Sequence, residues 1–203
     1  MNATVLKTVK GATPSRVRIP PSPPLHMEFK EVIHHPVPHI RIENVFSEET
    51  LEFFDELIHG ELFHNKTKMY ELFRPVGGDY STHILDAYRE VYQNRFDLAN
   101  TLGVTLPEGR HSERSTIQGY QGPDKYNLHL DTNQKIMTSV VYLSPEQNVG
   151  TKFYENGKGD GMYEDPWRVN CGYIFCRSEN SWHNYENPQN NLRWVAMYNI
   201  QNV

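Results

Sequence analysis

The sequence contains little cysteine and no long apolar run. Its two cysteines, Cys171 and Cys176, lie five positions apart in a stretch typical of a β-strand. Side chains at an odd separation along a strand point to opposite faces, so we expect two free thiols, as is typical of a reducing compartment. No apolar run approaches the roughly 18 residues of a membrane helix, and residues 1–25 lack the apolar core of a signal peptide. We therefore expect a cytoplasmic protein that does not contact a membrane.

The sequence also lacks an excess of positive charge. Its formal net charge is −5 and its isoelectric point is near 6.0. Proteins that bind nucleic acid usually carry a basic face, so this balance argues against a nucleic-acid partner. Four basic residues near the N-terminus still leave nucleic-acid demethylation open as an alternative: Lys7, Lys10, Arg16 and Arg18.

The chain length allows one domain with a substantial core and does not allow two. Residues 1–25 are rich in proline, carry only positive charge and show neither a helix nor a strand period. We interpret this segment as a flexible arm. Residues 26–203 are predicted to form a single domain, with helical support over 46–103 and a β core over 113–203.

A first helix is predicted to begin after Ser47. Serine is a favourable N-cap, and Phe46 and Leu51 occupy the two positions of a hydrophobic staple. Gly60 can end the helix. One face of this helix is apolar: Leu51, Phe54, Leu57 and Ile58.

A second helix is predicted from about Thr82 to Leu102, and Gly103 can end it. Apolar and aromatic residues recur at helical spacing along this stretch. We expect five of them to point inward: Leu85, Tyr88, Val91, Tyr92 and Phe96.

The second half of the sequence has the composition of short strands. Residues 39–43 already alternate between polar and apolar, which indicates a half-buried strand. Further segments are rich in β-branched and aromatic residues and are separated by turn formers, namely 113–120, 135–143, 151–155, 167–176 and 192–202. Short strands at this spacing are typical of an antiparallel sandwich or barrel. The predicted fold class is therefore mainly β with N-terminal helices.

One histidine stands out among the ten because of its neighbours. His129 lies two residues before Asp131. In an extended chain, residues two apart point to the same side, so an imidazole and a carboxylate can meet at one point. The tripeptide alone is common. The histidines other than His129 and His183 show no second set with metal-ligand spacing, and we interpret them as solvated or hydrogen-bonded.

A second histidine follows the apolar strand 172–176. His183 is succeeded by a stretch dense in turn formers, residues 186–191, and then by another strand that begins at Leu192. If the two flanking strands form a hairpin, Arg193 becomes a spatial neighbour of His183.

These residues together fit one kind of metal chemistry. Two histidines and one aspartate with open coordination positions form the facial triad of non-haem Fe(II) sites. A 2-oxo acid can chelate the metal through two open positions, and its far carboxylate then needs a cation. Arginine suits that task because its planar fork binds a carboxylate through two hydrogen bonds.

The pattern H-x-D, a histidine about fifty residues later and an arginine ten residues after it resembles the 2-oxoglutarate/Fe(II)-dependent dioxygenase superfamily, and most of all its prolyl-4-hydroxylase-like branch. Residues 120–131 resemble the family's Y-x-G-x-x-x-Y-x-x-H-x-D region. The strand 138–144 resembles the family strand that carries a tyrosine toward the co-substrate. Residues 150–154 resemble the Gly-Gly-x-x-x-Phe edge strand, with Thr151 in place of the second glycine.

The resemblance implies a double-stranded β-helix, or jelly roll, braced by helices. It implies Fe(II) bound by His129, Asp131 and His183. It further implies 2-oxoglutarate as co-substrate together with O₂, and ascorbate as a further reductant. The co-substrate would contact three residues: Arg193, Tyr142 and Tyr120.

The resemblance also suggests a hydroxylase that acts on a peptide or protein, with a prolyl residue as the first candidate. Candidate substrate contacts are Tyr126, Trp182 and Asn184. A small molecule such as a free amino acid is an alternative substrate. A non-catalytic jelly-roll binding module and a Zn²⁺ hydrolase are two further readings, although neither requires the arginine at 193.

Overall fold

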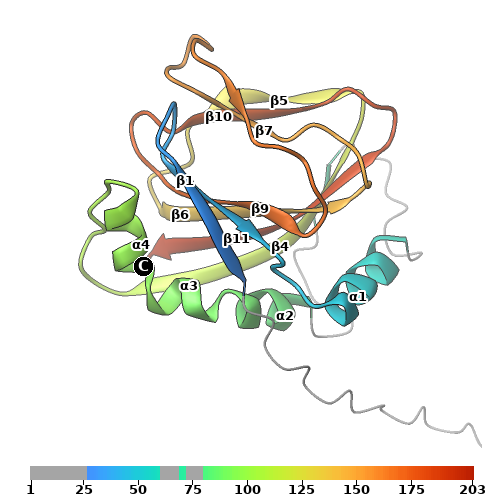
Figure 1. The fold of residues 1–203 in the computed structure, drawn as a ribbon, viewed down its shortest axis with the longest axis horizontal. Helices are drawn as coiled ribbons and strands as arrows, with labels where there is room; N and C mark the ends of the chain where they lie inside the picture. The colour runs from blue at the N-terminus through green and yellow to red at the C-terminus, as the bar shows by residue number, and fades with distance from the viewer. Residues whose placement is uncertain (1–26, 60–68, 72–79) are drawn as a thin grey trace, which may run out of the picture.

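The computed structural model describes residues 27–59, 69–71 and 80–203. The predicted N-terminal arm and Gly60 lie outside these residues. The described chain forms two antiparallel sheets and a set of helices (Figure 1). The elements in chain order are β1 (Glu28–Ile33), β2 (His39–Glu43), α1 (Glu48–His59), β3 (Met69–Glu71), α2 (Tyr80–Ala87), α3 (Arg89–Gln93), α4 (Arg95–Thr101), β4 (His111–Gln121), β5 (Asp124–His129), β6 (Lys135–Ser144), β7 (Thr151–Tyr154), β8 (Tyr163–Glu164), β9 (Cys171–Cys176), β10 (Trp182–Asn187) and β11 (Leu192–Asn202).

The two sheets face each other as the walls of a jelly roll. The larger sheet has seven strands in the order β1-β2-β9-β6-β11-β4-β3, and the smaller has four in the order β5-β10-β7-β8. Figure 1 shows α1, α2 and α3 beneath the larger sheet, while the smaller sheet lies above it, and no helix of the described residues covers its outer side. The fold class predicted from the sequence, mainly β with supporting helices, is confirmed.

The first helix forms as its sequence predicts. The Oγ atom of Ser47 accepts a hydrogen bond from the backbone N–H of Thr50 at 3.1 Å, which satisfies one of the free N–H groups at the helix start. Phe54 and Ile58 are buried against the core, and Leu51 and Leu57 are partly buried.

The second predicted helix is instead three short ones. The helical turns of α2, α3 and α4 are interrupted at Tyr88 and Asn94, although backbone bonds such as Tyr92 N–H to Tyr88 O at 3.0 Å carry across. Tyr88 is fixed to the sheet by stacking on Tyr198, with ring centroids 4.3 Å apart. Val91 is buried as expected, but Phe96 is 40% exposed, so its predicted inward position is wrong.

The larger sheet separates two cores. Residues that alternate along β6, β9 and β11 point either to the helices or to the smaller sheet. The helix-facing core is mostly aliphatic. Trp194 belongs to it and packs over Gly119 of β4, where an added Cβ would lie 2.6 Å from the indole ring. The core between the sheets is more aromatic and contains Tyr120, Tyr142, Phe153, Tyr173 and Phe175.

Both cysteines lie on strand β9, and both are free thiols. Cys171 and Cys176 are buried, and their odd separation along the strand places them on opposite faces. The absence of a disulfide is as predicted. Within the described ranges, the helices are too short and too polar to cross a bilayer.

Candidate metal centre and anion pocket

A cavity of about 230 Å³ lies between the two sheets. Its walls include His129, Asp131 and His183, and Arg193 comes from the opposite sheet. The structure thus brings together the four residues that the sequence analysis placed in one site.

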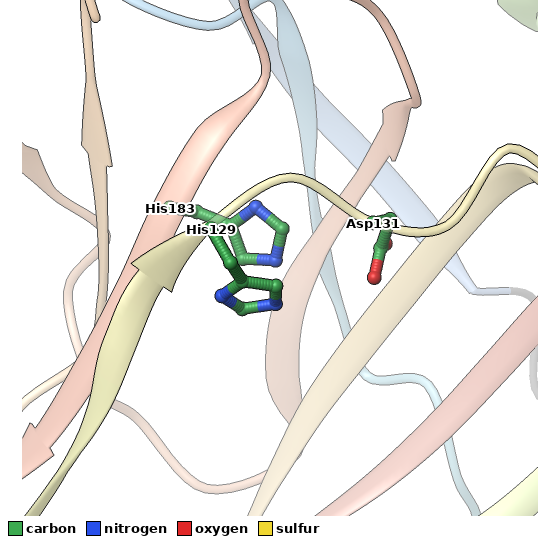
Figure 2. Close-up of side chains that lie close together, drawn as sticks. All are labelled: His129, Asp131 and His183. Carbon is green, nitrogen blue, oxygen red and sulfur yellow. The ribbon is translucent and has the colours of Figure 1, made fainter. Parts of the chain in front are cut away.

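The two histidines approach each other because β5 and β10 are paired. His183 lies opposite His129 in the register, and the ring centroids are 4.4 Å apart. Figure 2 shows the two rings close together, with Asp131 across a gap from them. One nitrogen of each histidine and one oxygen of Asp131 all lie within 4.8 Å of one another.

Hydrogen bonds orient both imidazole rings for metal binding. The Nδ1 atom of His129 lies 2.9 Å from the carbonyl oxygen of Asn127, and Nδ1 of His183 lies 2.9 Å from that of Ser181. A carbonyl can only accept, so each Nδ1 carries the hydrogen and each Nε2 presents a lone pair. Such backbone partners fix the tautomer of metal-ligating histidines.

The electrostatics favour the protonation states that a metal needs. Burial lowers the pKa of His183 to about 4, so its imidazole is neutral at neutral pH. Burial of Asp131 favours its neutral form, but Lys135, His183 and a hydrogen bond from Thr138 outweigh this and hold the pKa of Asp131 below its usual range. A neutral imidazole and a carboxylate are the forms that bind metal.

Asp131 keeps ligand capacity although both of its oxygens have partners. Lys135 Nζ donates to Oδ1 at 2.8 Å, and Thr138 Oγ1 donates to Oδ2 at 2.7 Å. A carboxylate has about four lone-pair directions, so each oxygen can still bind a cation. Two nitrogens and one carboxylate with an open side suit Fe(II) or Zn²⁺.

Arg193 is a buried cation without an acceptor. It is 1% exposed, and its Nε and Nη2 atoms have no hydrogen-bond partner among the described residues. Three aromatic rings surround the guanidinium, whose carbon lies 4.5 Å from the ring centroid of Tyr185, 5.1 Å from that of Trp167 and 5.7 Å from that of Tyr142. Leaving buried guanidinium donors unpaired is costly, so an anion that entered the cavity would stabilise Arg193.

The hairpin that would bring Arg193 next to His183 does not form, although both residues line the same cavity. Strand β10 pairs with β5 and β7, whereas β11 pairs with β4 and β6 in the other sheet. The turn formers at 186–191 carry the chain across from one wall of the jelly roll to the other. His183 and Arg193 therefore share the cavity as residues of facing walls.

Tyr142 lies beside Arg193, but its hydroxyl has protein partners. It donates to Asp165 Oδ2 at 2.9 Å and accepts the backbone N–H of Thr151 at 3.1 Å. Burial raises the pKa of Asp165 to about 7, against the opposing effects of Tyr142 and Arg41. The Nε atom of Arg41 lies 3.4 Å from Asp165 Oδ1.

Three tyrosines in contact with one another line the cavity. Tyr120 contacts Tyr185, with ring centroids 4.4 Å apart, and Tyr185 stacks on Tyr126 at 5.6 Å. Tyr126 is 43% exposed and lies with its edge against the His129 ring, at 4.7 Å. The Tyr120 hydroxyl donates to Gln118. Tyr120 and Tyr126 thus line the cavity, and their ligand roles remain predictions.

The other two candidate substrate contacts lie elsewhere. Strand β10 directs His183 and Tyr185 into the cavity, so Trp182 and Asn184 point to the outer face of the smaller sheet. Asn184 Oδ1 accepts a hydrogen bond from Tyr154 at 3.1 Å. The structure does not bring these two residues to the cavity.

Sequence reasoning missed several residues of the site. Tyr185 could have been found, because it is two positions after His183 on the same strand face. Thr138, Thr151 and Lys135 carry no spacing signal of their own. Asp165 precedes β9 in a stretch without a strand pattern, so only the fold reveals its contact with Tyr142.

No protein-family model and no curated protein matches this sequence. Solved structures do match. The viral collagen prolyl hydroxylase of Paramecium bursaria Chlorella virus-1, in complex with 2-oxoglutarate, has a TM-score of 0.60 at 13% identity, over 81% of this chain and 96% of its own. A prolyl hydroxylase from Trichoplax adhaerens, in complex with a peptide fragment of hypoxia-inducible factor, has a TM-score of 0.53 at 17% identity, over 80% and 83%.

A 2OG-Fe(II) oxygenase family protein from Burkholderia pseudomallei matches with a TM-score of 0.54 at 16% identity, over 80% of this chain and 84% of its own. The chain therefore has the fold of prolyl hydroxylases and 2OG-Fe(II) oxygenases. The resemblance noted in the sequence is confirmed at the level of the jelly-roll fold.

Proposed function

We propose that this chain is an Fe(II)- and 2-oxoglutarate-dependent oxygenase that hydroxylates a peptidyl substrate, with a prolyl residue as the first candidate. One observation carries the proposal. The cluster of His129, Asp131 and His183 opens into the same cavity as Arg193, whose buried Nε and Nη2 atoms have no acceptor among the described residues. A metal site and an unsatisfied cation in one cavity suit a ligand that chelates at one end and carries a carboxylate at the other.

Each residue has a definite task in this scheme. His129, Asp131 and His183 would hold the metal, with their orientation fixed by backbone carbonyls and by Thr138. Arg193 would bind the far carboxylate of 2-oxoglutarate through its Nε and Nη2 hydrogens. With iron and O₂ bound, the site would supply the oxidation that converts 2-oxoglutarate to succinate and CO₂ and hydroxylates a substrate C–H bond.

The cavity wall supports chemistry that must exclude bulk water. Val140, Phe175 and Val195 line it beside the charged groups. An apolar wall lowers the local dielectric and strengthens the interaction of Arg193 with a carboxylate. It also keeps water from the reacting centre.

The peptide substrate is supported by the site mouth and by the comparisons. Tyr126 lies exposed beside His129, where a substrate group would approach the metal. An apolar ring such as that of proline packs well on an aromatic face. The Trichoplax adhaerens enzyme is described as a prolyl hydroxylase bound to a peptide. A small-molecule substrate remains the second candidate, because the cavity is only about 230 Å³.

A zinc hydrolase accounts for less of the site. Its metal could be held by the same three side chains. However, a hydrolase does not need a buried arginine at the far end of the cavity. The two unpaired donors of Arg193 would then have no explanation.

The test is anaerobic titration of the purified protein with Fe(II) and then with 2-oxoglutarate. A visible charge-transfer absorption should develop only when both are present, because a 2-oxo acid must chelate the iron. The His183→Ala variant should show none. Succinate release on exposure to air would then be compared across prolyl peptides, other peptides and free amino acids.

The outcomes separate the alternatives. Absorption in the wild type and none in His183→Ala supports the metal and the co-substrate together. Bound iron without the absorption would remove the 2-oxoglutarate proposal and favour a hydrolase or a binding module. Peptide-dependent succinate release would support a peptidyl substrate, and release only with free amino acids would overturn it.

A further inference from the structure

An anion held by Arg193 could accept further hydrogen bonds from polar side chains near the guanidinium. Tyr142 is the obvious neighbour, since its ring lies 5.7 Å from the guanidinium carbon. The described contacts of its hydroxyl decide whether Tyr142 can donate to a ligand. A hydroxyl has one hydrogen and two lone pairs, so each of its hydrogen bonds has a direction.

The hydrogen of Tyr142 is committed to Asp165. The hydroxyl donates to Asp165 Oδ2 at 2.9 Å, and the ionised carboxylate, the form of Asp165 above its pKa of about 7, only accepts. The Tyr142 oxygen in turn accepts the backbone N–H of Thr151 at 3.1 Å. Both Tyr142 and Asp165 are at most 1% exposed, so water cannot readily replace either partner. Tyr142 therefore presents its ring to Arg193 and has no hydrogen left for a ligand.

Thr151 occupies the adjacent position on the cavity wall. It is the first residue of β7, lies opposite Tyr185 in the register and lines the cavity. Tyr185 is the residue whose ring is nearest to the Arg193 guanidinium, at 4.5 Å. Directly opposed residues on one sheet face have Cβ atoms about 5 Å apart, so Thr151 lies next to the anion site.

The hydroxyl of Thr151 still has a hydrogen to donate. Its Oγ1 accepts from the Tyr173 hydroxyl at 2.8 Å, which uses one lone pair and leaves the hydrogen. No described residue accepts that hydrogen from Thr151. Since Thr151 is 4% exposed and lines the cavity, the free hydrogen can be satisfied by a ligand there.

We infer that Thr151 is the second donor to the carboxylate that Arg193 binds, and that Tyr142 is not. This inference rests on the proposed function, because it assigns a contact to the far carboxylate of 2-oxoglutarate. The hydrogen bond from Tyr173 orients the Thr151 hydroxyl. Because the Thr151 oxygen accepts from Tyr173, the Thr151 hydrogen must point away from Tyr173 and can point toward the ligand. The site would thereby select 2-oxo acids with a second carboxylate.

The test compares variants that differ in the Thr151 hydroxyl alone. Thr151→Val by itself would leave the buried Tyr173 hydroxyl without its acceptor and could unfold the protein. Tyr173→Phe is therefore the reference, and Thr151→Val in the Tyr173→Phe background removes both partners of that bond. Thr151→Ser keeps the hydroxyl and is the matched control. Thermal unfolding checks that all variants are folded.

Two probes isolate the far carboxylate. Binding to the Mn(II)-loaded protein is measured by calorimetry with 2-oxoglutarate and with 2-oxopentanoate, which has a methyl group in place of that carboxylate. Burial raises the pKa of Asp165 to about 7, so the titrations are run at about pH 8, above that pKa, where Asp165 is mostly ionised.

The expected result is a selective loss. The double variant should bind 2-oxoglutarate at least about tenfold more weakly than Tyr173→Phe, because a hydrogen bond to a charged group is lost. Its affinity for 2-oxopentanoate should change by less than about threefold, and Thr151→Ser should bind 2-oxoglutarate about as well as the wild type.

Two results would overturn the inference in different ways. Equal 2-oxoglutarate affinity in the double variant and in Tyr173→Phe, or an equal loss for both probes, removes the role of Thr151 and leaves the proposed function standing. Failure of the wild type to bind either 2-oxo acid in the presence of Mn(II) removes the proposed function itself.

Discussion

The two walls of the jelly roll contribute different chemistry. The smaller sheet provides both histidines of the candidate metal site, and the larger sheet provides Arg193. Strand β5 of the smaller sheet exposes Lys125, Tyr126 and Asn127 to solvent. By contrast, nearly every residue of β11 around Arg193 is buried, and helices cover the outer face of its sheet (Figure 1).

This difference indicates how the site divides its tasks. A buried unpaired cation costs free energy, and only a well-packed part of the structure can hold it in place. The candidate metal ligand His129 lies beside the exposed Tyr126, where a substrate would reach a bound metal, and backbone carbonyls orient both histidines. Variants in each wall should therefore fail in different ways.

The largest effect is expected from a metal ligand of the smaller sheet. His183→Ala removes one of three ligands and should weaken metal binding by more than about a hundredfold, since even loss of an outer partner costs 10–100-fold. Competition with a chelator measures it. His59→Ala, at an exposed histidine of α1, should leave metal affinity unchanged. Equal losses in both variants would contradict the assignment.

A substitution at Arg193 in the larger sheet should weaken 2-oxoglutarate binding without lowering the stability of the protein. Arg193→Met removes the buried charge, so the ligand-free protein should be as stable as the wild type or more stable, by up to about 4 kcal/mol. Its affinity for 2-oxoglutarate should fall about a hundredfold or more, since two charge-assisted bonds are lost. Urea unfolding and calorimetry measure the two quantities.

Arg193→Lys sharpens the same comparison. It keeps the charge but loses the fork, so it should retain the stability of the wild type and recover only part of the affinity. A marked loss of stability in Arg193→Met would instead show that Arg193 is mainly structural.

A pH-dependent effect is expected behind the anion site. Burial raises the pKa of Asp165 from 3.8 to about 7 in the folded protein. The stability that this group contributes is therefore complete below about pH 4 and is lost as the pH rises through about 7. The groups facing it are Tyr142 on β6, Arg41 on β2, Tyr163 on β8 and, through Arg41, Glu31 on β1.

Asp165→Asn removes this titration. The melting temperature of the wild type, measured relative to that of Asp165→Asn, should fall as the pH rises from about 5 to about 8. Thermal unfolding across that range measures it. A difference that is independent of pH would mean that the pKa of Asp165 is not raised.

The smallest effect is expected on the helix-facing side of the larger sheet. Tyr88→Phe removes the hydrogen bond of 2.6 Å between Tyr88 and Ser139 and should cost about 1 kcal/mol of unfolding free energy. Affinity for 2-oxoglutarate should not change, because the altered side chain lies across the sheet from the cavity. A change in affinity would show that the two cores are coupled.

The sequence predicts the parts of this molecule that depend on local spacing. The N-cap at Ser47, the opposed faces of Cys171 and Cys176, and the shared direction of His129 and Asp131 follow from helix and strand periods alone. The four residues of the site could be assembled only through the family pattern, because 52 residues separate Asp131 from His183.

Long-range contacts account for what the sequence does not predict. Turn formers before Leu192 are compatible with a hairpin, yet the chain crosses to the other sheet. Asp165 takes the hydrogen of Tyr142, which no pattern around either residue signals. The helix is interrupted at Tyr88, whose ring stacks on Tyr198, more than a hundred residues away, and no local pattern signals this contact.

The position of Arg193 also sets an order of events. It lies 1% exposed at the inner end, whereas Tyr126 at the mouth is 43% exposed. A peptide resting on Tyr126 would close the route by which a dicarboxylate reaches Arg193. Under the proposed function, the co-substrate would therefore enter before the peptide, and its product would leave after the peptide has moved away. Initial-rate kinetics should accordingly follow a compulsory-order pattern with 2-oxoglutarate as the leading ligand.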